Sequence, residues 1–355
     1  MYKRILKPIL FQFNPELVHK VFVWIGIFLG SNPITRKIID MAYGYHGKYI
    51  SKTVDGITYK TPIILSAGFD YNANLTQILP SLGFGGVEVG SVTARPCLGN
   101  PKPTLARLPN SSALIVNKGL KNDGVDVIIK RLKRKRRFKD FVIGVSIAKT
   151  NDAQSADTQE AIQDYCYSFK RLNEEDIGDY YTINISCPNA FGGETFTKPD
   201  LLEQLLFEIK KIPCTKPVYV KMPINIFWEE TKSLLDIIVK YKLNGVIFGN
   251  LNKNYLDIPH TPERPPEYRG GISGKPCFHP SNILIEKTKK EYGDKLTIIG
   301  CGGIFTPVDA MYKFKIGSEL IHLITGMIYE GPSLIKKICE ELARHPREGE
   351  DPSTK

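Results

Sequence analysis

The apolar residues at the start of the chain follow a pattern that predicts two short helices. Asn-Pro pairs at residues 14–15 and 32–33 each supply a capping side chain and a proline suited to a first helical turn. Between the two pairs, residues 21–30 (VFVWIGIFLG) form an apolar run. A helix that spans a membrane needs about 20 such residues, so this run predicts no transmembrane segment. We therefore expect residues 1–46 to form a small helical extension.

From residue 50 onward, short apolar runs alternate with longer amphipathic stretches. Asp55-Gly56 predicts the turn of a small hairpin. Strand candidates then follow at residues 63–66, 86–89, 142–147, 181–185, 218–221, 245–248, 296–299 and 320–323. Helical patterns separate them, for example at residues 157–172, 198–212, 228–242 and 331–344. This alternation favours an α/β fold, a (β/α)8 TIM barrel over residues 47–344, rather than a doubly wound sheet. We expect the polar residues 345–355 to form a disordered tail.

Composition and charge narrow the functional classes. The 355 residues are 42% hydrophobic, which is ample for one large core. Seven cysteines and six histidines are scattered without metal-ligand spacing, which favours reduced thiols in a cytosolic protein and no metal site. The formal net charge of +11 suggests nucleic acid or an anionic membrane as partner. However, the basic run Lys130–Lys139 has neither aromatic interleaving nor a reader motif. We interpret it as a solvated helix end and expect no nucleic-acid partner.

Two interpretations of the apolar N-terminal extension stay open from its residues alone. Basic side chains flank the apolar helix, an arrangement that suits a membrane surface because cations meet lipid phosphates. These flanking residues are Lys3, Arg4, Lys7, Lys20, Arg36 and Lys37. The same apolar residues are equally suited to cap the core of the barrel.

In a TIM barrel, the active site lies at the carboxyl ends of the strands. Gly302 and Gly303 follow the seventh predicted strand, and Thr325 and Gly326 follow the eighth. Glycine turns at these two strand ends allow a phosphate to approach the backbone closely. Lys221 directly follows an apolar run (VYVKMP), where its charge suits an anionic cofactor. These positions predict a phosphate-bearing cofactor at the barrel mouth.

The most specific string is NISCPN, residues 184–189. Asn184 and Asn189 bracket Cys187, so amide donors and acceptors surround one thiol. A free cysteine has a pKa of about 8.5, and a polar or cationic site lowers it enough for general-base work. Inert packing is the commoner role of a lone cysteine, but a Cys-Pro turn between two asparagines is an odd core element. We therefore predict that Cys187 is catalytic.

These motifs resemble those of the dihydroorotate dehydrogenase family, over essentially all of residues 8–341. NISCPNAFGG resembles the active-site segment of the family, and SLGFGGVEVGSVTARPCLGNPKPTLARLP resembles its second strand and following loop. GGISGKP, IIGCGGI and TGMIYEGPSLIKKI resemble its flavin-binding stretches. The similarity is closest to the membrane-associated, quinone-reducing class, which also carries a two-helix N-terminal extension.

The resemblance implies an enzyme of pyrimidine (UMP) biosynthesis that oxidises dihydroorotate to orotate with FMN and passes the electrons to a quinone. Cys187 would take a proton from C5 while a hydride leaves C6 for the flavin. The implied FMN contacts are Ala67, Gly68, Ser91, Ser146, Lys221, Ser273, Gly274, Gly302, Gly303, Thr325 and Gly326. The implied substrate contacts are Asn184, Asn189, Asn250, Asn117 and Tyr71. The extension would form the quinone entrance of a peripheral protein on the cytoplasmic side of a membrane.

Several positions depart from the family pattern, and one of them departs from the pattern of the quinone-reducing class. They are Cys187 (serine in that class), Tyr71 (lysine), Val116 (asparagine, with Asn117 one residue along), Ser146 (asparagine) and Leu251 (threonine). Lys118 or Lys121 would then have to supply the charge that Tyr71 lacks. Two alternatives stay open: a related FMN enzyme that acts on another cyclic amide or pyrimidine or uses a soluble acceptor, and a non-catalytic flavin-binding interaction protein.

Overall fold

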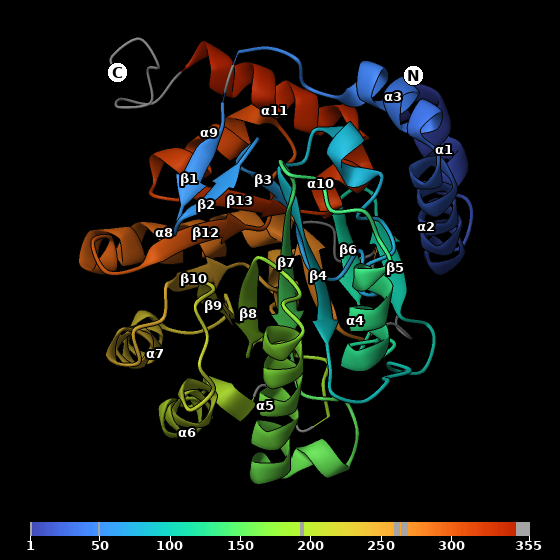
Figure 1. The fold of residues 1–355 in the computed structure, drawn as a ribbon. Coiled ribbons are helices and arrows are strands. Elements are labelled where there is room, and N and C mark those ends of the chain that lie inside the picture. Colours follow the sequence, from blue (N-terminus) through green and yellow to red (C-terminus); the bar gives the residue numbers. More distant parts are fainter. Residues whose placement is uncertain (1, 49, 192–194, 259–262, 264–268, 346–355) are drawn as a thin grey trace.

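A computed structural model describes residues 2–48, 50–191, 195–258, 263 and 269–345, with a closed barrel of parallel strands at its centre (Figure 1). The barrel strands are β3 (Ile63–Leu65), β4 (Gly86–Val92), β7 (Val142–Ile147), β8 (Tyr180–Asn184), β9 (Val218–Met222), β10 (Gly245–Phe248), β12 (Thr297–Cys301) and β13 (Leu320–Leu323). The barrel closes where β13 pairs with β3, with Ile321 opposite Ile63. Each strand overlaps a predicted one, so the TIM-barrel prediction is confirmed.

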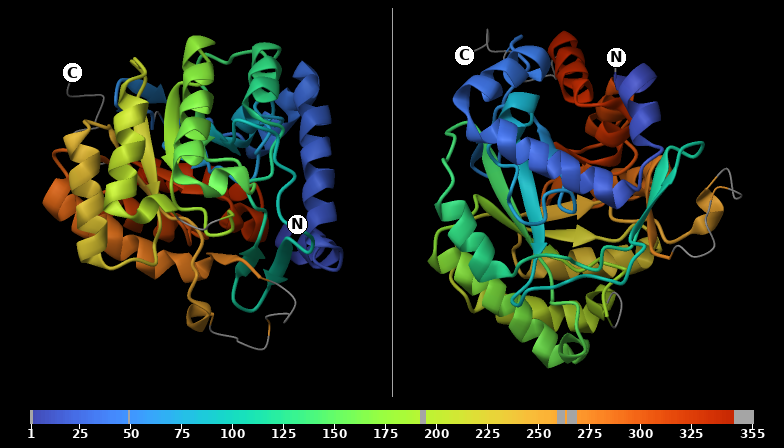
Figure 2. Two further views of the ribbon diagram at one scale, coloured as in Figure 1. Left: turned by 90° about the horizontal axis from the view of Figure 1, so that it is seen from below. Right: turned by 90° about the vertical axis from the view of Figure 1, so that its right-hand side faces the viewer.

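Helices surround the barrel on its outer face (Figure 2). They are α4 (Val125–Lys133), α5 (Thr158–Glu174), α6 (Pro199–Lys210), α7 (Trp228–Lys240), α8 (Phe278–Tyr292), α9 (Pro307–Lys315), α10 (Thr325–Glu330) and α11 (Ser333–Arg344). Successive side chains of a strand point to opposite faces, so each strand contributes to two cores. One core packs against the helices, and the other, with Ile64, Tyr180 and Tyr219, fills the barrel interior.

The predicted hairpin is formed by β1 (Lys52–Val54) and β2 (Ile57–Tyr59). Its two turn residues, Asp55 and Gly56, have φ angles of 48° and 80°, the left-handed region that an Asp-Gly turn provides at low cost. Tyr59 of β2 is fully buried and packs with the interior core. The hairpin therefore covers the end of the barrel opposite the strand carboxyl ends.

A second sheet, which the sequence did not predict, lies beside the mouth of the barrel. It is antiparallel and joins β5 (Leu105–Leu108), β6 (Ala113–Val116) and β11 (Gly271–Gly274). Ile115 of β6 pairs with Ile272 of β11, although these residues are far apart in the sequence. The sheet carries Ser273 and Gly274 to the same end of the barrel as the strand carboxyl ends.

The N-terminal extension contains the two predicted helices, α2 (Pro15–Ser31) and α3 (Pro33–Tyr43), with Asn14 and Asn32 as their caps. A short helical stretch before them, ending in α1 (Lys7–Leu10), was not predicted. Among the described residues, no single helix is long and apolar enough to cross a membrane; α2 and α3 meet that test only as a pair, bent by 113°. The predicted disordered tail, apart from His345, lies outside the described residues.

Candidate active site

A cavity of about 500 Å³ opens at the carboxyl ends of the strands and continues between α2 and α3. Most of the predicted site residues line it: Ala67, Gly68, Tyr71, Ser91, Asn184, Cys187, Asn189, Lys221, Asn250, Ser273, Gly274, Gly302, Gly303, Thr325 and Gly326. The barrel fold therefore gathers residues from seven strand ends and the second sheet around one space.

Two predicted residues, Ser146 and Asn117, do not line this cavity and lie one layer behind its wall. Ser146 is fully buried, and its Oγ lies 2.8 Å from the Oγ of Ser91. The Oδ1 of Asn117 accepts a hydrogen bond of 2.7 Å from Nδ2 of Asn100. The sequence placed both residues at strand or loop ends, but it did not show whether their side chains reach the cavity or lie behind its wall. In the structure Ser146 supports Ser91, which lines the cavity, whereas Asn117 bonds to Asn100, which does not line it.

Hydrogen bonds hold the segment before Cys187 in place. Nδ2 of Asn250 donates to the carbonyl oxygen and to Oγ of Ser186, both at 2.7 Å. Nδ2 of Asn184 donates to Oγ of Ser91 at 2.8 Å. The hydroxyl of Tyr165 donates to the carbonyl oxygen of Asn184 at 2.7 Å. The backbone that carries the Cys187 thiol is therefore held by polar side chains from several strands.

Lys149, at the end of β7, is a buried cation close to Cys187. Its Nζ donates to the carbonyl oxygens of Ser155 (2.9 Å) and Phe191 (2.8 Å). Burial lowers the pKa of Lys149, while the negative charges of nearby acidic groups, including a Cys187 thiolate, act in the opposite direction. A cation beside a thiol stabilises the thiolate, the form that accepts a proton. The charge of Lys149 thus favours the thiolate form of Cys187.

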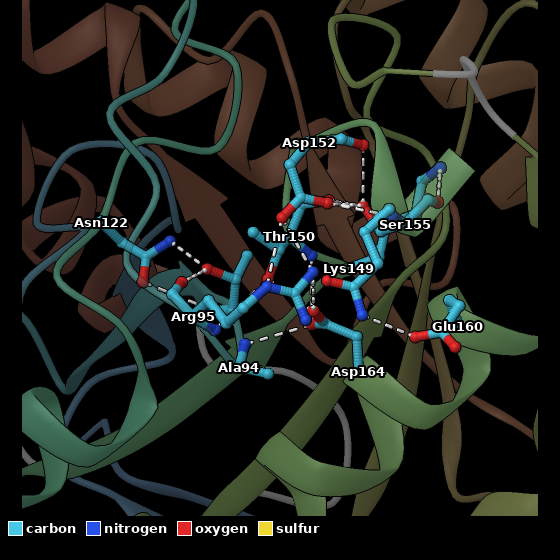
Figure 3. Close-up of polar contacts among 11 residues, drawn as sticks. Ala94, Arg95, Asn122, Lys149, Thr150, Asp152, Ser155, Glu160 and Asp164 are labelled. Carbon is cyan, nitrogen blue, oxygen red and sulfur yellow. Dashed lines mark hydrogen bonds and ion pairs between the residues drawn. The ribbon is translucent and has the colours of Figure 1, made fainter. Parts of the chain in front are cut away.

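A network of charged side chains supports the loop that carries Lys149 (Figure 3). The guanidinium of Arg95 forms an ion pair of 2.8 Å with Asp152 and a longer one of 3.4 Å with Asp164. Asp164 also accepts hydrogen bonds from the backbone N–H groups of Ala94 and Thr150, both at 3.1 Å. The loops that follow β4 and β7 are therefore fixed to α5.

An ionisable layer lies inside the barrel below the cavity. Nζ of Lys221 is 3.3 Å from Oγ of Ser66 and 3.8 Å from Oε1 of Glu88. Burial raises the pKa of Glu88, and the charge of Lys221 opposes that rise. His322 lines the cavity fully buried, and neither ring nitrogen has a hydrogen-bond partner in the described part of the chain. Burial, together with Lys221, lowers the pKa of His322, so its ring is neutral.

Close packing shapes the opposite wall. Gly303 has a φ of 75°, and a Cβ at this position would lie 2.3 Å from the Cβ of Phe278. Nearby, Oγ of Ser273 lies 2.9 Å from Oγ1 of Thr325, the first residue of α10. This narrow wall offers backbone N–H groups and two hydroxyls, which are groups that bind phosphate.

The part of the cavity under α2 is apolar apart from a few side chains. Nε2 of His19 donates a hydrogen bond of 3.0 Å to the carbonyl oxygen of Phe69, and the ring packs against Tyr71 with centroids 5.8 Å apart. Burial, aided by the charge of Lys118, lowers the pKa of His19 to about 4. Lys118 and Lys121 both line the cavity. The two predicted substitutes for the missing charge at Tyr71 therefore lie within reach of the same space.

The sequence did not identify His19, His322 or Arg107 as site residues. Arg107 of β5 also lines the cavity, and its Nη1 donates to the carbonyl oxygen of Phe13 at 2.6 Å. His19 lies fifty positions from the Phe69 carbonyl that it contacts, and Arg107 lies 94 positions from Phe13. No local motif in the sequence marks such contacts. The one weak signal of a site is that Arg107 and His322 are each an isolated polar residue among apolar neighbours in the sequence.

Comparisons with known proteins agree with this geometry. The family model described as dihydroorotate dehydrogenase matches residues 49–345. A protein of Thermosynechococcus vestitus named dihydroorotate dehydrogenase (quinone) is 32% identical over 96% of this chain and 96% of its own length. One of the same name from Christiangramia forsetii is 34% identical over 96% of this chain and 98% of its own length. The crystal structure of Eimeria tenella DHODH in complex with ferulenol superposes with a TM-score of 0.79 at 27% identity, covering 93% of this chain and 91% of the other.

Proposed function

The chain belongs to the dihydroorotate dehydrogenase family, and on that premise we propose how its cavity serves the reaction and which flavin it holds. The enzyme oxidises dihydroorotate to orotate in pyrimidine biosynthesis, with a flavin cofactor and a quinone as electron acceptor. One observation carries the proposal: a single cavity joins the Cys187 segment to the apolar space between α2 and α3. The polar substrate thus binds at the Cys187 end of this cavity, and the apolar electron acceptor binds at the end between α2 and α3.

The flavin of this enzyme is FMN. The residues that line the cavity are suited to FMN. The ring nitrogens of His322 are buried without a hydrogen-bond partner in the described part of the chain, so a bound group can supply one. Lys221 lines the same cavity and places its positive charge there. The wall of Gly303, Ser273 and Thr325 suits its phosphate. Bound there, FMN supplies the two-electron redox chemistry between substrate and quinone.

The side chains around Cys187 orient the substrate and move its proton. Asn184, Asn189 and Asn250 offer amide groups that match the carbonyl and N–H edges of a cyclic amide. The thiolate of Cys187 takes the proton from C5 of dihydroorotate. Lys149 stabilises that thiolate, and after the reaction the thiol returns its proton to solvent. Lys118 provides the positive charge for the substrate carboxylate, in place of the family lysine at Tyr71.

The quinone reaches the cavity between α2 and α3, and the extension rests on the cytoplasmic surface of a membrane. Exposed apolar side chains support this peripheral location. Of the 24 large apolar side chains that are exposed among the described residues, 14 belong to residues 5–41. Such a concentration is typical of a surface that meets lipid or a partner.

The proposal is tested by mixing the purified flavoprotein anaerobically with dihydroorotate and following flavin absorbance at about 450 nm. Rapid bleaching, followed by recovery of colour when a quinone is added, is the expected result. Colour that persists with dihydroorotate but bleaches with another reduced pyrimidine would favour the related-enzyme alternative. Colour that persists with all of them would favour a non-catalytic flavin-binding protein.

A further inference from the structure

The end of α4 carries a dense group of cations that the proposed reaction does not use. Most residues in the run Lys130–Lys139 (KRLKRKRRFK) are Lys or Arg. α4 itself ends at Lys133. Favourable interaction with the helix dipole is limited to the last turn, so it accounts for only the first part of this run.

The protein balances some of these charges and leaves others unbalanced. Arg131, Lys133 and Arg137 form ion pairs with Asp123, Glu175 and Asp179. Four further cations are exposed and form no ion pair with any described residue: Lys130, Arg134, Arg136 and Lys139. We call these four the α4 cation cluster. Close like charges repel one another, and an anionic partner relieves that repulsion.

The α4 cation cluster adjoins the N-terminal extension. The guanidinium groups of Arg36 (α3) and Arg136 lie 5.7 Å and 5.3 Å from the ring centroid of Phe138. Arg36 also donates to the carbonyl oxygen of Gly30 at 2.7 Å, and Gln77 donates to the carbonyl oxygen of Arg136 at 2.9 Å. The cluster is thereby held beside the turn between α2 and α3. Figure 2 shows α4, in teal, on the same side of the barrel as the blue N-terminal helices.

The extension presents an apolar face next to this cluster. Trp24 and Phe28 are 66% and 61% exposed, and their rings stack with centroids 6.0 Å apart. Ile34 and Met41 of α3 are 69% and 65% exposed. Apolar side chains that enter a lipid surface, flanked by cations at the level of the phosphates, form the usual pattern of an interfacial membrane contact.

We propose that the α4 cation cluster, together with Lys37 of α3, binds the headgroups of anionic phospholipids. The inference rests on the proposed membrane location and adds the class of lipid that the protein selects. Nucleic acid suits the surface less well, because the cluster borders an apolar face and because Arg36 and Arg136 cover the ring of Phe138, the aromatic residue within the basic run. The cations would also set the orientation of the extension on the membrane.

The test measures binding of the full-length flavoprotein to vesicles of phosphatidylcholine alone and of phosphatidylcholine with a minority of phosphatidylglycerol. The variant is Arg134→Gln/Arg136→Gln/Lys139→Gln. A matched control, Lys290→Gln/Lys295→Gln/Lys315→Gln, removes the same charge from the region of α8 and α9, across the barrel from α2 (Figure 1). Flavin content and dihydroorotate-driven bleaching should be unchanged in both variants.

The unaltered protein should bind the anionic vesicles more tightly than the neutral ones. The cluster variant should lose roughly a hundredfold in partitioning to anionic vesicles at low salt, since each cation near such a surface contributes about 1 kcal/mol. The control should keep its binding, and high salt should remove the difference between variants. Equal loss in the control, or no preference for anionic vesicles, would overturn the inference while leaving the membrane proposal intact. Failure to bind either kind of vesicle would instead refute the membrane location. If the unaltered protein and the control bound an RNA oligonucleotide and the cluster variant did not, the surface would be assigned to nucleic acid and the inference would be overturned.

Discussion

One buried carboxylate, that of Glu16, helps to attach α2 to the barrel, and its removal should loosen the end of the cavity that we propose for the quinone. Oε1 of Glu16 accepts hydrogen bonds from the backbone N–H (2.6 Å) and the hydroxyl (2.8 Å) of Thr104. Hydrogen bonds to charged groups contribute about 1.5–3 kcal/mol each, and water that enters the gap recovers part of this. The exposed Lys102, 3.9 Å away, adds little. We therefore expect Glu16→Ala to lower the stability of docked α2 by ~2–4 kcal/mol.

Hydrogen exchange of the α2 amides reports the stability of docked α2 directly. Urea unfolding, measured in parallel, reports the stability of the whole protein. Glu229→Ala is the matched control, because Glu229 also lies in the first turn of a helix but is exposed. In Glu16→Ala, bleaching by dihydroorotate should persist while the KM for quinone rises. A Glu16→Ala/Thr104→Val double-mutant cycle should give a coupling energy of about 1–3 kcal/mol.

The pH dependence supplies a second check on the same contact. Burial raises the pKa of Glu16, but the hydrogen bonds from Thr104 outweigh burial and hold the pKa below its ordinary value. A carboxyl group with a lowered pKa stabilises the fold above its unfolded pKa and loses that contribution as the pH falls. Protection of α2 should therefore decline in acid, and the decline should be smaller in Glu16→Ala. Unchanged exchange in the variant, or equal effects of Glu16→Ala and Glu229→Ala, would refute this account of the attachment.

Four further outcomes are expected. Cys187→Ala should retain its flavin but slow bleaching by dihydroorotate at least about a hundredfold, whereas near-normal bleaching would exclude Cys187 as the base. A protein that lacks residues 1–46 should still bleach with dihydroorotate but lose quinone turnover; unaltered turnover would contradict the assigned quinone entrance. Lys118→Met should raise the KM for dihydroorotate without loss of flavin, and an unchanged KM would remove Lys118 from substrate binding. The pKa of His19 is lowered to about 4, so as the pH falls the unfolded chain binds a proton before the folded chain does, and the free energy of unfolding should decrease between pH 6.5 and 4. His19→Gln should make the free energy of unfolding less dependent on pH in this range, and an identical pH dependence would show that His19 does not contribute.

The parts of the fold that sequence could predict are those set by local patterns. The barrel strands carry continuous apolar runs because both of their faces are buried, and the helices α2 and α3 begin at Asn-Pro signals. The sheet of β5, β6 and β11 was missed because its strands are short and the pairing of Ile115 with Ile272 is not local.

The same distinction applies to the site. Sequence placed Cys187 and its asparagines together because they share one short string, and barrel geometry places strand ends at one mouth. It did not separate Ser91, which faces the cavity, from Ser146 behind it, since both lie near strand ends. Nor did it predict His19, whose contact with Phe69 arises only when α2 packs on the barrel.

The cavity has walls of two origins, and this has a consequence for how such an enzyme diversifies. The barrel supplies the wall around Cys187, whereas α2 and α3 supply much of the wall at the other end. Substitutions in the extension would therefore reshape the end of the cavity that we propose for the electron acceptor, without moving Cys187 or its amide neighbours. Under the proposed roles the two ends of the site are modular: the first few dozen residues can change to suit another quinone, while the barrel keeps the chemistry on the pyrimidine ring.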